Sequence, residues 1–206
     1  KNINMSAKPF ALGVRIEHSQ SMINESQYGM KSHAKLAPAS YKLTYTTTSG
    51  RGVYSFCMCP GGYVVNASSE DGLLAINGMS NYKRDTKYAN SAIVVTVGPN
   101  DYGVNILDGM YFQEMIEKRA YKICDGLIPV QGYEDYKNND IDAFKGNIGY
   151  GNINDIFPEF INDSLKEGID YFDNKIKGFN GKDAIIAAPE TRTSSPIRIL
   201  RDENLE

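Results

Sequence analysis

The sequence has 206 residues, enough for one sizeable domain or for a β core that carries a second small lobe. Hydrophobic residues make up 41% and charged residues 23%, which argues against a disordered chain or a coiled coil. Lys and Arg number 22 against 25 Asp and Glu, so the net charge is −3 and no basic surface for phosphate contacts is indicated. We therefore predict no nucleic-acid partner.

Apolar runs in this sequence fall far short of the ~20 residues that a membrane helix needs, and no signal peptide is visible. Three cysteines, Cys57, Cys59 and Cys124, are too few for a disulfide framework and indicate thiols in a reducing compartment. We expect a cytoplasmic protein with no membrane partner. The chain begins at Lys1 without an initiator Met and ends in Leu205-Glu206, a pair typical of a cloning site, so we also expect a piece of a longer protein.

The first half of the sequence has the period of β-strands. In Phe10–Glu17, apolar residues alternate with small or charged ones, as in a half-buried strand. Val53–Cys59 and Tyr63–Ala67 flank Pro60-Gly61-Gly62, and this composition predicts a β-hairpin with a tight turn. Ser91–Val97 is nearly continuous in apolar residues and is predicted to be a central strand. Two further strands are predicted at Tyr41–Thr48 and Leu73–Asn77.

The second half changes to helical spacing. Asp108 is a candidate cap for a helix with an apolar stripe that ends at Ile123. A second stripe, from Phe157 to Ile176, predicts a helix with Pro158 in its first turn and a stop at Gly178, with Gly181 as a second candidate. The Gly-, Asn- and Asp-rich residues between the stripes, 131–154, are predicted to be loop. The sequence then returns to a strand at Asp183–Ala188 and continues as an extended polar segment over Pro189–Arg201.

Strands followed by helices and then another strand indicate an α+β fold. We predict a mixed or antiparallel β core, a sheet or a partial barrel, formed by residues 1–99 and 183–206. The helical residues 100–182 are predicted to form a lobe inserted in that core.

The densest candidate for chemistry is Gly50–Gly62. On an extended strand Cys57 and Cys59 would lie on one face about 6.5 Å apart, so a disulfide between them would be strained. Zinc would need two further ligands at a suitable spacing, which the sequence does not offer, so no metal site is predicted. Gly61 and Gly62 are explained either by a turn that needs glycine or by a ligand that approaches bare backbone. The role of the two cysteines beyond packing stays open.

Two other polar segments are candidates for ligand contacts. Glu190–Arg198 offers hydroxyls and the guanidiniums of Arg192 and Arg198, which suit an anion or a polar heterocycle, or else it is a solvated connector. Asn77–Asp85 is a polar loop between strands, and His18 is a lone histidine that could titrate near neutrality or serve packing alone. The sequence has no G-x-G-x-x-G followed by a helix, no Walker A loop and no G-x-S-x-G elbow. The residues alone therefore indicate no complete enzyme, and no catalytic residue is assigned.

Five ordered strings give the chain a specific resemblance from Lys8 to Asp202. Together they resemble a family of bacterial FAD-dependent, NAD/FAD-utilising dehydrogenases that is largely uncharacterised. The strings are Lys8–His18, Tyr41–Leu43, Gly50–Gly62, Asn77–Ser80 and Glu190–Pro196.

The resemblance implies that this chain is the inserted, non-Rossmann portion of such a protein. The Rossmann halves that bind FAD would then be absent from it, and the fragment is expected neither to retain FAD nor to be active alone. In the parent, the β domain would cover the flavin and form a wall of the substrate pocket. Backbone at Gly61 and Gly62 would approach the flavin edge, and Arg192 or Arg51 would stabilise negative charge on reduced flavin. Thr193 and Ser194 would donate to oxygens of the ring or substrate.

The leading hypothesis is thus the substrate-side domain of a FAD-dependent oxidoreductase. Its partners would be the FAD-binding domain of the same polypeptide, an unidentified small-molecule substrate and NAD(P)H as a candidate electron donor. Two alternatives remain. One is a non-enzymatic module that binds a small polar ligand or sugar through Tyr41 and Tyr45. The other is a structural interaction domain.

Overall fold

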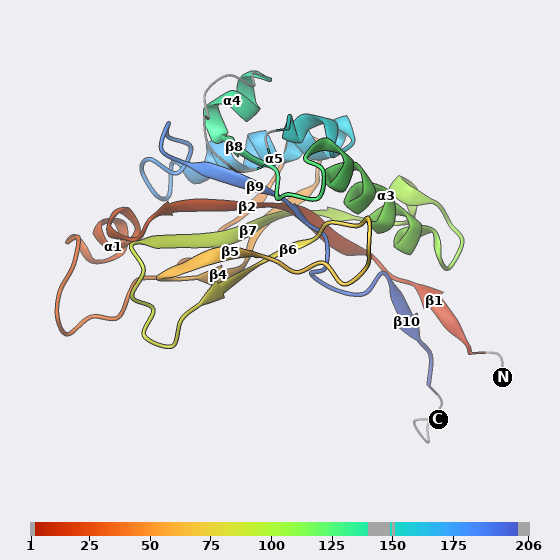
Figure 1. Ribbon diagram of the computed structural model, residues 1–206, viewed down its shortest axis with the longest axis horizontal. Coiled ribbons are helices and arrows are strands. Elements are labelled where there is room, and N and C mark those ends of the chain that lie inside the picture. The colour runs from red at the N-terminus through yellow and green to blue at the C-terminus, as the bar shows by residue number, and fades with distance from the viewer. Residues whose placement is uncertain (1–2, 140–148, 150, 202–206) are drawn as a thin grey trace.

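A six-stranded antiparallel sheet separates two layers of different kinds in the computed structural model, which describes residues 3–139, 149 and 151–201. Helices cover one face of the sheet, and the β5–β6 hairpin lies across the other (Figure 1). The strand order is β3-β4-β7-β2-β9-β8, with β1 and β10 forming a separate two-stranded ribbon. The strands are β1 (Met5–Ala7), β2 (Phe10–Ser19), β3 (Thr44–Thr46), β4 (Gly52–Cys59), β5 (Gly62–Asn66), β6 (Ile76–Ser80), β7 (Tyr88–Val97), β8 (Val130–Gly132), β9 (Ile185–Glu190) and β10 (Ile197–Ile199). The helices are α1 (Gln20–Tyr28), α2 (Pro99–Tyr102), α3 (Asp108–Ile123), α4 (Tyr133–Asn138), the short 3-10 turn η1 (Ile153–Asp155) and α5 (Glu159–Phe172). The predicted α+β class with an antiparallel β core is confirmed.

The two long central strands, β2 and β7, explain why the sheet has two different faces. They pair along their whole length, from Phe10 opposite Val97 to Ser19 opposite Tyr88. Large apolar side chains such as Leu12 and Val14 are fully buried under the helices. The alternate positions on β2 are small or charged, so the opposite face is covered more closely by backbone and polar groups. The predicted central place of the strand over 91–97 is confirmed by β7.

The helical layer is anchored by apolar stripes on α3 and α5. Ile116 and Ala120 on α3 and Leu165 and Ile169 on α5 are fully buried in the same core as the sheet residues. Both helices therefore exist where the 3.6-residue period predicted them. The helix α5 ends at Phe172, several residues before the predicted stop at Gly178, although Ile176 beyond it is still buried.

The predicted hairpin between the strands on either side of residues 60–62 is wrong. β4 pairs with β3 and β7, whereas β5 pairs with β6 in a separate sheet. The pairing of β4 with β7 shifts in register between Phe56 and Cys59, and Cys57 in the bulge has a φ of 43°. This bulge turns the chain out of the main sheet. Gly61 continues the change of direction with a φ of 52°, and a Cβ there would lie 1.9 Å from the carbonyl oxygen of Arg84.

Residues 131–139 also differ from the prediction of loop. Gln131 and Gly132 belong to β8, which pairs with β9 at the edge of the main sheet, and α4 follows directly. Tyr133 and Tyr136 are fully buried, and their hydroxyls donate to Asp170 and Asn162 respectively. Aromatic side chains that carry a polar group allowed a polar-looking segment to pack in the core. The rest of the predicted loop over 140–148 and residue 150 lies outside the described residues.

Residues 100–182 thus contribute helices and one strand of the sheet, and their apolar side chains share one core with residues of the flanking segments. The proposed division into a β core and an inserted helical lobe stays a prediction. None of the helices within the described residues is long and apolar enough to cross a membrane.

Because α5 packs closely on the sheet, we expect one glycine-to-alanine substitution in this helix to be destabilising. A Cβ at Gly168 would lie 2.6 Å from Cγ1 of Val53, which is fully buried on β4. We expect Gly168→Ala to lower the free energy of unfolding by about 1–3 kcal/mol through overpacking, although Ala is the better helix former. Urea unfolding measures this difference. Gly98→Ala is the control, because nothing lies within 4 Å of a Cβ there; an equal loss in both variants would contradict the packing account.

Candidate functional site

The segment that follows β9 crosses the end of the sheet and is held on alternate sides by buried polar groups. The carboxylate of Glu190 accepts from Arg15 on one side. Thr191 and Arg192 reach the carboxylate of Glu117 on α3 on the other side. The hydroxyl of Thr193 donates to the carbonyl oxygen of Ala11, 2.6 Å away. Four successive residues are therefore fixed, which is unusual for a connector on the protein surface.

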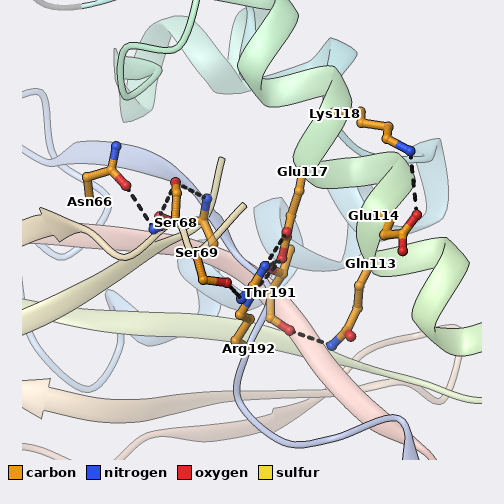
Figure 2. Close-up of polar contacts among 10 residues, drawn as sticks. Asn66, Ser68, Ser69, Gln113, Glu114, Glu117, Lys118, Thr191 and Arg192 are labelled. Atoms are coloured by element: carbon orange, nitrogen blue, oxygen red, sulfur yellow. Dashed lines mark hydrogen bonds and ion pairs between the residues drawn. The ribbon is translucent and has the colours of Figure 1, made fainter. Parts of the chain in front are cut away.

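Glu117 and Arg192 form the ion pair at the centre of this site (Figure 2). Nε of Arg192 lies 3.0 Å from Oε1 of Glu117, and Nη2 lies 2.8 Å from Oε2, so the pair is bidentate. The Glu117 side chain is 2% exposed, whereas that of Arg192 is 40% exposed. The pKa of Arg192 is raised, mainly because its guanidinium donates to Glu117. Arg192 is thus held firmly on one side and open to ligand on the other.

The guanidinium keeps hydrogen-bonding capacity for a ligand. Arginine has five N–H groups, and Arg192 uses one on Nε, one on Nη2 and one on Nη1, which donates to the hydroxyl of Ser69. Two N–H groups remain without a partner among the described residues. The main chain of Thr191 is fixed as well, since Nε2 of Gln113 donates to its carbonyl oxygen at 2.9 Å.

A cavity of about 330 Å³ opens beside Arg192. We call it the Arg192 pocket. Its walls mix apolar side chains with carboxylates; Glu117 pairs with Arg192 and Glu114 with Lys118, whereas Glu70 has no ion pair among the described residues. A polar but uncharged group suits these walls better than an anion. The lining residues are Glu70, Leu73, Met110, Gln113, Glu114, Glu117, Arg192, Ser194, Ser195 and Pro196.

The second polar cluster lies under the β5–β6 hairpin and centres on Arg15, whose side chain is fully buried. Its Nε lies 2.8 Å from Oε2 of Glu190, which is 2% exposed. Nη1 donates to Oδ1 of Asn90 at 2.8 Å and to the carbonyl oxygen of Cys57 at 3.1 Å, and Nη2 donates to Oδ1 of Asn77 at 2.9 Å. Burial raises the pKa of Glu190, and the adjacent guanidinium opposes that shift. This cluster fixes one end of the segment that carries Arg192.

Comparison with known proteins shows to which family the chain belongs. Residues 9–193 match the model of the family described as FAD-dependent protein, C-terminal domain-like. The chain belongs to this family. It is also 47% identical, over its whole length, to an uncharacterised protein of Clostridium beijerinckii, and it spans 41% of that protein's length. The matched residues include the Arg15 cluster and the ion pair of Glu117 with Arg192, but not the pocket residues Ser194, Ser195 and Pro196.

Three of the residues predicted from the resemblance to a FAD-dependent family lie together in the structure. Arg192 and Ser194 line the Arg192 pocket, and Thr193 lies between them in sequence. The Thr193 hydroxyl donates to the carbonyl oxygen of Ala11 and so holds the segment in place.

The other three predicted site residues lie elsewhere. Gly61 and Gly62 are buried near the end of β2, where the amide of Gly61 donates to Oε1 of Gln20, whereas the Arg192 segment contacts the beginning of β2. Arg51 lies two strands away from β2, at the start of β4. Both of its terminal nitrogens donate to Asp101, and the guanidinium lies 4.3 Å from the ring centre of Phe160.

The side chains of three other residues predicted from the sequence contact groups within the protein rather than an open site. His18 is buried, its Nε2 lies 2.8 Å from the carbonyl oxygen of Phe179, and burial lowers its pKa to about 4, so it does not titrate near neutrality. Tyr41 is buried against Phe179, and Tyr45 stacks on a tyrosine ring while its hydroxyl donates to Glu167. The two tyrosines thus form no open aromatic face.

Arg15 and Glu117 hold the candidate site in place, and neither was predicted from the sequence to be a site residue. Arg15 stood on the expected polar face of a strand, where a solvent-exposed arginine is ordinary. A signal was present: its neighbours on that face, Ala11 and Gly13, are too small for a freely exposed surface and indicate a covered one. Glu117 lies beside the apolar stripe of α3, and nothing in the sequence identifies its distant partner.

The Arg15 cluster predicts strongly non-additive substitutions. Arg15→Met leaves the buried carboxylate of Glu190 unpaired, so we expect a loss of about 3–5 kcal/mol in the free energy of unfolding. Glu190→Leu leaves the guanidinium unpaired and has a similar cost. The double variant removes both charges and should lose clearly less than the sum of the two losses. Urea unfolding of the four proteins tests this; additive losses would show that the two side chains do not act as a pair.

Proposed function

We propose that this chain is the flavin-covering, substrate-side domain of a FAD-dependent oxidoreductase and that the Arg192 pocket faces the flavin or its substrate. The observation that carries the proposal is the state of Arg192: fixed by Glu117, partly exposed, and provided with two unused N–H groups in a chain of this family. A buried carboxylate that holds a surface arginine in one orientation is typical of a recognition site.

The residues of the pocket fit one edge of a flavin ring but not a whole FAD. The N–H groups of Arg192 and the hydroxyl of Ser194 suit ring carbonyl oxygens, and Leu73, Met110 and Pro196 offer apolar contact. The sequence has no glycine-rich strand–turn–helix for the pyrophosphate, so the rest of FAD would lie on other parts of the parent. FAD, when bound in the parent, supplies hydride transfer.

The β1–β10 ribbon supports a connection to such a part. Met5 pairs with Ile199 and Ala7 pairs with Ile197, so the two strands leave the sheet side by side (Figure 1). Apolar side chains are exposed there, with Ile199 60% and Leu200 48% accessible. Pro196, at the start of the ribbon, also lines the Arg192 pocket. A domain that docked on the ribbon would therefore lie beside the pocket.

Within the proposal, the residues of this chain position the flavin or its substrate and polarise one of its oxygen atoms. Arg192 donates to an oxygen that gains negative charge, Glu117 keeps the guanidinium in place, and the apolar wall excludes water. A small-molecule substrate and NAD(P)H as electron donor belong to the same proposal.

Flavin content tests the proposal most directly. We expect the longer parent protein to be purified yellow, with flavin absorbance, and the 206-residue chain to be purified colourless under the same conditions. The reason is that the family implies FAD while the dinucleotide fingerprint is missing from this chain. A colourless parent that takes up no added FAD would falsify the flavoprotein proposal.

Loss of Arg192 should affect the flavin of the parent. Arg192→Ala removes the donors from the pocket, so we expect flavin reduction to slow by at least about tenfold, with a lower flavin midpoint potential. Stopped-flow reduction and potentiometry measure the two effects. Arg192→Lys keeps the charge but not the bidentate geometry and should have an intermediate effect.

Arg119→Ala is the matched control, because Arg119 is an exposed arginine on the same helix as Glu117. Urea unfolding shows whether each variant is folded. An unchanged reduction rate and potential in folded Arg192→Ala would remove Arg192 from the site.

A further inference from the structure

A second cavity lies on the opposite face of the sheet from the helices, between the hairpin strand β5 and the strands β2, β9 and β8. Its volume is about 280 Å³, close to the lower limit of about 300 Å³ for pockets that bind small molecules. Its walls are mostly apolar, and we call it the Glu17 cavity. The apolar lining residues are Tyr63 and Val64 on β5, Ile128 and Val130 at β8, and Ile185 and Ala187 on β9.

Sheet register explains why these residues meet. Glu17 pairs with Ile185, and Arg15 pairs with Ala187, so the two charged side chains of β2 and the two apolar side chains of β9 share one face. Val130 on β8 is opposite Ala187 and extends the same row. The floor of the cavity is thus regular sheet, which is more rigid than a loop.

Glu17 is the one charge of the cavity that nothing compensates within the described residues. Arg15 also lines the cavity, but it is fully buried and its charge is paired with Glu190. Asn90, the cross-strand neighbour of Glu17, directs its Oδ1 at Arg15. Tyr63 hydrogen-bonds to Met79 and Asn81 of the hairpin, not to the carboxylate.

The lone carboxylate is costly to the fold. Burial raises the pKa of Glu17, so the folded state favours its protonated form. A half-buried acid without a partner, on the floor of an apolar cavity, destabilises the domain at neutral pH. Such a residue is typical of a ligand site, where function rather than stability sets its identity.

We propose that the Glu17 cavity binds a small organic cation, an amine with a compact apolar body. The ammonium group pairs with the Glu17 carboxylate, and the Tyr63 ring adds a cation–π contact. The apolar body lies against Val130, Ile185 and Ala187. Anions are excluded by the same carboxylate. This site is separate from the Arg192 pocket, and the inference does not rest on the proposed flavin function.

The test uses three probes of the same shape and different charge. They are 2-phenylethylammonium, the neutral 2-phenylethanol and the anion phenylacetate, added to ¹⁵N-labelled chain and followed by amide chemical shifts. We expect the amine to bind more tightly than the alcohol, phenylacetate not to bind, and the shifts to map to β2, β5 and β9. Glu17→Gln should weaken amine binding at least about tenfold, by loss of the charge pair, and leave the alcohol unchanged.

Glu25→Gln, at an exposed glutamate on α1, is the matched control and should bind the amine normally. Equal affinity for amine and alcohol, shifts that map elsewhere, or amine binding that survives Glu17→Gln would each overturn the proposal. Binding to the 206-residue chain but not to the longer parent would also overturn it, because another part of the parent would then fill the cavity.

Thermal unfolding gives an independent readout of the same carboxylate and shows that the variant folds. The pKa of Glu17 in the folded chain is raised above its ordinary value of 4.5. The charged form therefore destabilises the fold as the pH rises through the folded pKa, and this penalty is absent below the unfolded pKa. We expect Glu17→Gln to raise Tm at about pH 7 and to leave it unchanged at about pH 4. An equal Tm for variant and wild type at about pH 7 would contradict an unpaired Glu17.

Discussion

The buried guanidinium of Arg15 is the interaction on which the rest of this domain depends. It connects four segments that are distant in sequence, through Cys57 on β4, Asn77 on β6, Asn90 on β7 and Glu190 on β9. A charge so deeply buried is tolerated only when an opposite charge and further hydrogen-bond acceptors surround it. The hairpin layer, the central strands and the site segment therefore have to be correctly placed together.

This constraint explains how an irregular segment presents a well-ordered site. Glu190 is fixed to the sheet by Arg15, and two residues later Arg192 is fixed to the helical layer by Glu117. The segment is held between the two layers, so the orientation of Arg192 does not depend on a surface loop alone. The Glu17 cavity borders the same Arg15 cluster and is lined by Ile185 and Ala187 of β9, whereas the Arg192 pocket is lined by residues that follow this strand.

The spacing of apolar residues predicted the strands and helices whose formation depends on their own sequence. The alternation in residues 10–17 and the apolar stripes that end at Ile123 and Ile176 describe elements whose burial follows from their own sequence. The pairing of β4 with β7 rather than β5 was not predictable in this way, because a bulge at Cys57 redirects the chain toward the carbonyl contact with Arg15. The resemblance to a FAD-dependent family led to the prediction of Arg192 and Ser194, which line one pocket, but not to the partner of Arg192, since Glu117 is 75 residues away.

The position of β9 in the sheet has a consequence for the order in which the protein is made. β9 pairs with β2, the first long strand, yet it begins at Ile185, near the end of the chain. While the ribosome makes the intervening residues, β2 can pair with β7 but keeps its other edge open. An open edge of a central strand is a template for pairing with other chains. Synthesis of this domain therefore has a long interval in which the strand that covers this edge of β2 in the finished fold has not yet been made.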